Sequence, residues 1–389
     1  MEIIKLQVSD ETLRDGIQQV GLFLDDEAKR TLAQLIAQTG VHQIALMPAI
    51  HDSEAALVQD LITHGLQQQV VASTMMSRQY IDQAQSCGVQ QIILFHAISD
   101  RLLCLRDPDI QQHERYGEGK LPETLLKAAR RRMLEKVLDN LLYATRVGLK
   151  VCFAAEDASR ANFNFLVEAI RTFQPHIDYF LLCDTVGVLT PEKTYIWIQD
   201  LLQCSDHAPL AVHFHNDMGL ALENTIQAIF AGAMGISGTF GGIGERAGNV
   251  ALEQVLFGLR ARFGWVVEGI DYDALHRVTD DLAQRGIWAN PPYSPQSQRF
   301  ETGIHVSSLL RDRNSYSVFP HSEPDIWYGK CSGASSFRYL FETHLNQSLT
   351  QNQYEQLRSD IKALAIAEKR SFSAKEVLTL LEQGVLKVP

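Results

Sequence analysis

The sequence predicts an α/β protein: a (β/α)8 TIM barrel followed by a small, mainly helical C-terminal region. Eight short runs rich in Val, Ile, Leu and Phe recur up to about residue 240, and a helix-length amphipathic segment follows each of them. Continuous apolar runs of this kind are typical of parallel strands that are covered on both faces. The eight runs begin at Ile3, Gln43, Val70, Gln91, Lys150, Tyr179, Leu210 and Gly235.

The segments that follow the runs have the length and the apolar periodicity of amphipathic helices. We expect these helices at 25–38, 52–65, 77–86, 123–145, 161–173, 191–202, 220–231 and 246–262.

The same alternation also fits an open, doubly wound sheet, but the position of the polar residues favours the barrel. In TIM barrels the active site is built from the C-terminal ends of the strands. In this chain nearly every strand ends in groups capable of chemistry, as in SDETLRDG, FHAISD, AAEDASR, CDTVG, HFHND and GGIGERAGN. We therefore expect a closed barrel with its active site at this end.

The 389 residues exceed one barrel, which takes about 250 residues. The strand and helix repeat stops after Gly264, and NPPYSP from Asn290 has the composition of a connecting loop. We expect a catalytic barrel at 1–264, a linker and lid subdomain at 265–345, and a helical region at 346–389.

Charge and cysteine usage limit the partners and the compartment. The formal net charge of −11 argues against a general nucleic-acid binder. The N-terminus does not resemble a secretory signal, and no apolar run is long enough to cross a bilayer. The six cysteines are scattered without a C-x-x-C pair, which fits reduced thiols. We expect a cytoplasmic protein that acts on small molecules, with no nucleic-acid or membrane partner.

His213 lies in the strand-like run LAVHF, and His215 directly follows that run, two residues after His213. Residues two apart on a strand point to the same side, so both imidazoles can face the barrel interior. Asp15, after the first strand, can add an anionic oxygen from across the barrel. These ligands suit a catalytic divalent cation such as Mg²⁺, Mn²⁺ or Zn²⁺, although H-x-H alone also fits two hydrogen-bonded polar side chains.

Six motifs occur together along nearly the whole chain: DETLRDGIQ from Asp10, EDASR from Glu156, DTVGVLTP from Asp184, HFHNDMGLALENT from His213, GIGERAGN from Gly242 and ETGIHV from Glu301. In kind and order they resemble the family of homocitrate, isopropylmalate and citramalate synthases. These enzymes condense the acetyl group of acetyl-CoA with a 2-oxo acid. The chain is too short for the leucine-sensing domain of many isopropylmalate synthases, so it is most similar to the short homocitrate synthases. The resemblance thus implies 2-oxoglutarate as the acceptor and homocitrate as the product.

The resemblance also implies the ligands of the metal and the residues that bind the 2-oxo acid. The metal would be held by Asp15, His213 and His215, with Asn249 beside it. Four further positions match residues that contact the acceptor in the family. Arg14 and Gln18 would bind its keto-acid end, and Arg160 and Thr185 its distal end.

The acetyl half of the reaction is assigned by the same resemblance. Glu156, His305 and Tyr316 match the catalytic residues that remove the methyl proton, and Glu245 and Arg246 match residues near the thioester. In the family the lid segment carrying His305 and Tyr316 reaches over the neighbouring subunit, which implies a homodimer with an exchanged C-terminal region. A packing role for Tyr316 and a structural ion pair for Glu245 are the alternatives.

Several positions depart from the family pattern: Ala45, Met47, Leu102, Ser307, Cys331 and the long polar loop at 105–124. They affect the expected acceptor pocket more than the expected chemistry. The chain could therefore use another 2-oxo acid, such as oxaloacetate, pyruvate, 2-oxoisovalerate or a specialised acceptor. Two further alternatives are a hydroxymethylglutaryl-CoA lyase-like enzyme, although GGIGERAGN lacks that enzyme's cysteine, and a diverged paralogue without catalytic activity.

Overall fold

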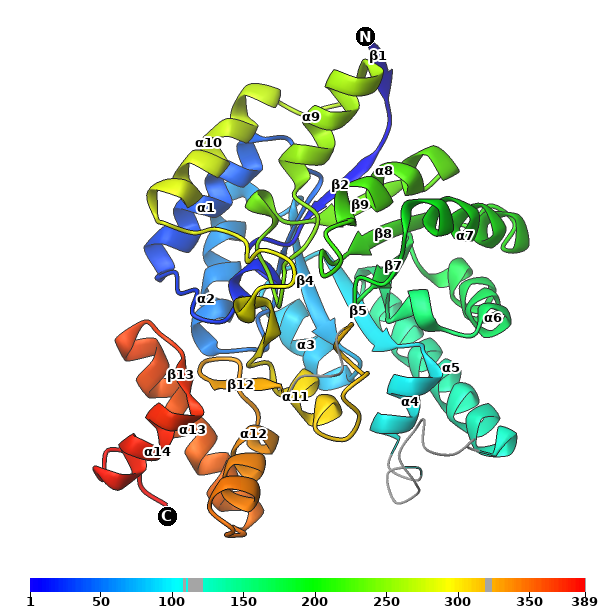
Figure 1. Ribbon diagram of the computed structural model, residues 1–389. Helices are drawn as coiled ribbons and strands as arrows, with labels where there is room; N and C mark the ends of the chain where they lie inside the picture. Colours follow the sequence, from blue (N-terminus) through cyan, green and yellow to red (C-terminus); the bar gives the residue numbers. More distant parts are fainter. Residues whose placement is uncertain (108–109, 111–121, 319–323, 389) are drawn as a thin grey trace.

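The computed structural model describes residues 1–107, 110, 122–318 and 324–388 (Figure 1). Eight parallel strands close into a barrel in which each strand pairs with the next along the chain and the last pairs with the first. This confirms the predicted fold class. The barrel strands are β2 (Gln7–Asp10), β3 (Gln43–Leu46), β4 (Val70–Met75), β5 (Gln91–Ala97), β6 (Lys150–Glu156), β7 (Phe180–Asp184), β8 (Leu210–Phe214) and β9 (Gly235–Gly238).

The first predicted strand, from Ile3, is divided between two sheets. Glu2–Ile4 forms β1, which pairs outside the barrel with β10 (Trp265–Val267), and only β2 enters the barrel. Ile3 is 72% exposed, whereas Val8 is fully buried. The prediction of one continuous strand was wrong here, because an apolar run does not show where its pairing partner changes.

Helices surround the barrel as expected (Figure 1). Two differences affect the site. The last barrel helix begins at Leu252, later than predicted, because 246–251 form part of the loop at the barrel mouth. A short helix that was not predicted, α4, follows β5. The barrel helices are α1 (Asp26–Gln38), α2 (Asp52–Leu61), α3 (Arg78–Ser86), α4 (Asp100–Arg106), α5 (Glu123–Arg146), α6 (Phe163–Phe173), α7 (Pro191–Cys204), α8 (Ala221–Ala231) and α9 (Leu252–Phe263).

The C-terminal region contains helices and a small three-stranded sheet. After α10 (Tyr272–Gln284), which packs against α1, come β11 (Arg299–Phe300), α11 (Gly303–Leu309), β12 (Asp325–Tyr328), α12 (Ala334–Tyr339), α13 (Gln351–Glu368), β13 (Phe372–Ser373) and α14 (Ala374–Glu382). The boundaries expected at residues 264 and 345 remain predictions. In the part of the chain that is described, no helix is long and apolar enough to cross a membrane.

The hydrophobic core of the C-terminal region includes residues of the barrel. Leu102 and Leu105 of α4 are buried in one cluster with Tyr316, Tyr328 and Phe337. Leu102, one of the departures from the family pattern, therefore joins the barrel to the C-terminal region.

This position gives a stability prediction. Leu102→Ala should leave a cavity in the shared core and lower the free energy of unfolding by about 2–5 kcal/mol, as measured by chemical denaturation. Leu142→Ala, on the 43% exposed Leu142 of α5, is the control and should cost less than about 0.5 kcal/mol. Equal losses in the two variants would show that Leu102 does not hold the two parts together.

Candidate metal and substrate site

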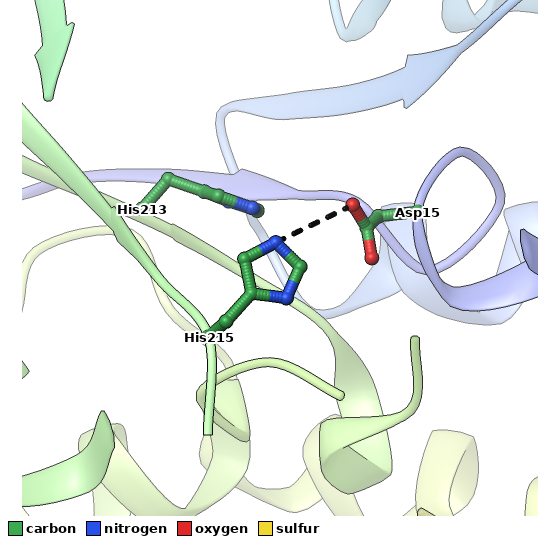
Figure 2. A group of neighbouring side chains, drawn as sticks. All are labelled: Asp15, His213 and His215. Atoms are coloured by element: carbon green, nitrogen blue, oxygen red, sulfur yellow. Dashed lines mark ion pairs between the residues drawn. The ribbon is translucent and has the colours of Figure 1, made fainter. Parts of the chain in front are cut away.

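Three predicted metal ligands meet at the C-terminal mouth of the barrel (Figure 2). One ligand atom from each of Asp15, His213 and His215 lies within 4.8 Å of the others, and all three residues are buried. The two imidazole rings are nearly perpendicular, with centroids 5.1 Å apart, and His215 Nε2 lies 3.9 Å from an oxygen of Asp15. The expected convergence of these distant residues is confirmed.

Neighbouring strands and loops hold the three side chains in place. His213 Nδ1 is 3.1 Å from the hydroxyl of Ser237 on β9, which leaves Nε2 for another partner. The backbone of Asn249 forms an isolated antiparallel β-bridge with that of His215. The side-chain amide of Asn249 donates to Asp15 at 2.7 Å. Gly244 passes so close that an added Cβ would lie 2.3 Å from the Asn249 amide nitrogen and 2.6 Å from an Asp15 oxygen. A glycine is required here by this close backbone approach.

The chemistry of these groups fits a divalent cation. Among the described residues, His215 Nδ1 and Asn249 Oδ1 are buried polar atoms without a hydrogen-bond partner. Burial lowers the pKa of both histidines, so their rings are neutral at pH 7. Burial alone would raise the pKa of Asp15, but Arg14, the two histidines and the Asn249 hydrogen bond together outweigh it and keep the carboxylate ionised. One anionic oxygen and two neutral imidazoles are suitable ligands for such an ion.

Arg14 lies beside this group between two carboxylates. Its Nε donates to Glu11 at 2.6 Å and its Nη1 to Asp15 at 3.0 Å. Glu11, only 1% exposed, also accepts from Ser237 at 3.2 Å. Sequence reasoning missed Glu11, although its place directly after β2 in DETLRD was a signal.

Glu156, His305 and Tyr316 form a second group, of which Glu156 and His305 line the same cavity. Tyr316 donates to Glu156, and His305 stacks on the Tyr316 ring with centroids 3.9 Å apart. His305 Nδ1 lies 2.7 Å from Glu245. Arg106, at the end of α4, binds both oxygens of Glu156 at 2.5 and 2.8 Å and also contacts the Tyr316 hydroxyl. No motif contained Arg106, so sequence reasoning missed it.

The remaining predicted substrate residues divide into two kinds. Gln18, Thr185 and Glu245 line the cavity. Arg160 is not among the lining residues, and Arg246 is buried against Asp217, with Nε–Oδ1 and Nη2–Oδ2 distances of 2.7 and 2.9 Å.

The segment carrying His305 and Tyr316 lies over the mouth of its own barrel. His305 meets Glu245 and Tyr316 meets Glu156 of the same chain. An exchange of C-terminal regions is therefore not needed to complete this site, and the homodimer remains a prediction.

Comparison with known proteins places the chain in a family. The family model described as HMGL-like matches residues 5–107 and 120–282, and the chain belongs to this family. Homocitrate synthase AksA of Methanopyrus kandleri is 33% identical over 322 residues, which are 81% of this chain and 76% of that protein. The 2-isopropylmalate synthase 2 of Caldanaerobacter subterraneus subsp. tengcongensis is 29% identical over 390 residues, 98% of this chain and 96% of that protein.

Among solved structures, the hydroxymethylglutaryl-CoA lyase of Pseudomonas aeruginosa superposes with a TM-score of 0.57 at 20% identity. The superposition covers 76% of this chain and 96% of the lyase. At this identity the likeness shows the shared barrel fold.

The metal group gives a binding prediction. The wild type should bind about one Mn²⁺ per chain, and His215→Ala should weaken that binding at least about 100-fold without loss of the fold. Isothermal titration calorimetry would measure the Mn²⁺ affinity, and circular dichroism would measure the retention of the fold. His64→Ala, in an exposed histidine, is the control. Unchanged affinity in His215→Ala would exclude this metal site.

The Arg106–Glu156 pair gives a pH prediction. Burial alone would raise the pKa of Glu156, but Arg106, with smaller contributions from His305 and Tyr316, lowers this pKa to about 2. The pair therefore stabilises the fold above the ordinary pKa near 4.5, and this stabilisation is lost only as the pH falls toward 2. In Arg106→Met burial is unopposed by that charge, so the pKa of Glu156 should rise.

We expect Arg106→Met to lower the free energy of unfolding at pH 7 by about 3–5 kcal/mol, because it leaves a buried charge without its partner. The deficit should shrink at pH 5 as the carboxyl binds a proton. Denaturant titrations at both pH values measure it, with exposed Arg131→Met as a control that should change little. A deficit that does not depend on pH would contradict the assigned pairing.

Proposed function

We propose that this chain is an acyltransferase that condenses the acetyl group of acetyl-CoA with a 2-oxo acid. One observation carries the proposal. A single cavity is lined by the Asp15, His213 and His215 group and by His305, which is held by Glu245. The names of the related homocitrate and isopropylmalate synthases support the same chemistry.

The first half of the site suits the 2-oxo acid. Asp15, His213 and His215, with Asn249 beside them, would hold a divalent cation, which supplies Lewis-acid polarisation of the keto oxygen. Arg14, fixed between Glu11 and Asp15, presents a guanidinium to the same end of the cavity. Such a group stabilises the alkoxide that develops when the keto carbon is attacked.

The second half suits removal of a proton from the acetyl methyl group. Glu245 bonded to Nδ1 of His305 favours the tautomer whose Nε2 carries a lone pair, so Nε2 is our candidate base. Glu156 is a poor base at pH 7 because its pKa is about 2. We assign it to positioning Tyr316, whose ring lies against His305.

In the proposed reaction His305 takes a proton from the methyl group, and the methyl carbon forms a bond to the keto carbon. The keto C=O opens to an alkoxide, which gains a proton. Water then attacks the thioester carbon, the C–S bond breaks, and CoA leaves as a free thiol. The product is a malate substituted at C2.

The barrel likeness to hydroxymethylglutaryl-CoA lyases leaves the reverse, C–C cleaving chemistry as an alternative. The 241–249 loop, GGIGERAGN, contains no cysteine, and the lid adds His305 to the cavity. Both features favour the condensing reaction. A homodimer in solution remains part of the proposal, to be tested by light scattering.

The activity prediction concerns His305. Purified protein with Mn²⁺ and acetyl-CoA should release free thiol only when a suitable 2-oxo acid is added. His305→Ala should lower kcat by about 10²–10⁴-fold and stop deuterium exchange at the acetyl methyl group, while 2-oxo acid binding persists.

Thiol release can be followed with a chromogenic disulfide and the exchange by NMR. His344→Ala, in an exposed histidine, is the matched control. Exchange at the wild-type rate in His305→Ala would show that another group is the base. Cleavage of a 3-hydroxyacyl-CoA without condensation would favour the lyase, and no activity with any acid would favour a non-catalytic protein.

A further inference from the structure

The cavity has two chemically different ends. The metal ligands, Arg14 and His305 lie at the mouth, where the strands end. A second part of the lining, here called the wall, is made by side chains of β4, β5, β6 and β7 and of the residues that follow β3 and β7. Its apolar members are Met47, Ile93, Phe95, Ala154 and Leu181.

The polar groups on that wall carry no charge that could pair with an anion. Ser73 and Thr185 offer hydroxyls, and Cys183 is a buried thiol 3.8 Å from the Leu181 carbonyl oxygen. Among the residues that the structure describes, Arg14 is the one arginine or lysine lining the cavity, and it belongs to the metal end.

With a divalent cation at the Asp15, His213 and His215 group, the charges around the cavity would balance without a second substrate carboxylate. Four carboxylates line it: Glu11, Asp15, Glu156 and Glu245. Arg14 and a divalent cation would offset three of them, and Arg106 offsets Glu156 from outside the cavity. The C1 carboxylate of a 2-oxo acid would add one negative charge. A second carboxylate at the apolar wall would be buried without a counterion, which is costly.

Arg160, expected to meet a distal carboxylate, is engaged elsewhere. Its guanidinium donates to both oxygens of fully buried Asp157 at 2.6 and 2.9 Å. It also donates to the backbone carbonyls of Asn314 and Ser315, each at 2.6 Å. These bonds tie the lid segment to the barrel, and Arg160 is not among the residues that line the cavity.

We propose that the acceptor is a 2-oxo monocarboxylic acid with an apolar side chain, packed against the wall formed by Met47, Ile93, Phe95 and Leu181. This inference rests on the proposed condensing function and replaces the expectation of 2-oxoglutarate. The product is then a malate that carries an apolar substituent at C2. The reaction that supplies the acceptor must yield an apolar 2-oxo acid, as transamination of an apolar amino acid does.

The first experiment measures kcat/KM of the wild-type enzyme, with Mn²⁺ and saturating acetyl-CoA, for a panel of acids. We expect kcat/KM to rise about fourfold for each added methylene from pyruvate through 2-oxobutyrate to 2-oxovalerate, the gain from burying one methylene. The best apolar acid should exceed 2-oxoglutarate and oxaloacetate by at least about 100-fold, the order of cost of an unpaired buried charge.

The outcomes separate this inference from the proposed function. A kcat/KM for 2-oxoglutarate or oxaloacetate that equals or exceeds the kcat/KM for every apolar acid would overturn the inference. The condensing function would then remain intact. No thiol release with any acid of the panel would overturn the condensing function itself.

The second experiment places a cation at the wall. Met47→Lys should raise kcat/KM for 2-oxoglutarate relative to the best apolar acid by at least about tenfold, because the ammonium can pair with the distal carboxylate. Met234→Lys makes the same change at an exposed methionine that precedes β9, at the opposite end of the barrel, and should leave the ratio as in the wild type. A ratio that Met47→Lys leaves unchanged would show that the acceptor side chain does not reach this wall.

Discussion

The pairing of β2 with β9 is the constraint on which the site depends. It closes the barrel by joining Gln7–Asp10 to Gly235–Gly238 in parallel register. It thereby brings Asp15 within hydrogen-bond distance of Asn249, 234 residues away. The strands can approach because Gly235 has no side chain, since an added Cβ would lie 2.8 Å from the Gln7 side chain. Without this closure Asp15 would follow one edge strand of an open sheet, and His213 would lie on the strand next to the other edge.

Charge pairing then determines how the lid lies on the barrel. The contacts that join them include three that use an ionisable side chain of the barrel mouth: Glu245 to His305, Glu156 to Tyr316, and Arg160 to the backbone at Asn314. Burying these groups would be costly if they stayed unpaired. The lid is therefore stable where it satisfies them, and that position brings His305 to the cavity. Leu102 adds an apolar contact between the same two parts.

The sequence allowed prediction of those features that strand periodicity controls. The eight barrel strands follow from continuous apolar runs, and the Asp15, His213 and His215 group follows from the alternation of side chains along a strand and from parallel strand ends meeting at one rim. The orientation of Arg160 and the role of Arg106 could not be predicted in this way. A long arginine side chain reaches several partners, and the partners of both arginines include lid atoms, at Ser315 and Tyr316, more than 150 residues away in sequence.

The same distinction bears on how far the family resemblance supports the proposed chemistry and the proposed substrate. The motifs contain the strand-end groups that we propose hold a metal and move a proton, and these depend little on what the acceptor carries beyond its keto group. The distal wall is built from positions outside the motifs, such as Ile93 and Leu181, or from a departure such as Met47. An arginine retained within a motif is weak evidence for a dicarboxylate, because Arg160 can keep its place in the sequence while its charge is neutralised by Asp157. Under the proposed function, the acceptor would be selected by the charges that remain unpaired inside the cavity, and that balance is set by side-chain pairing in three dimensions.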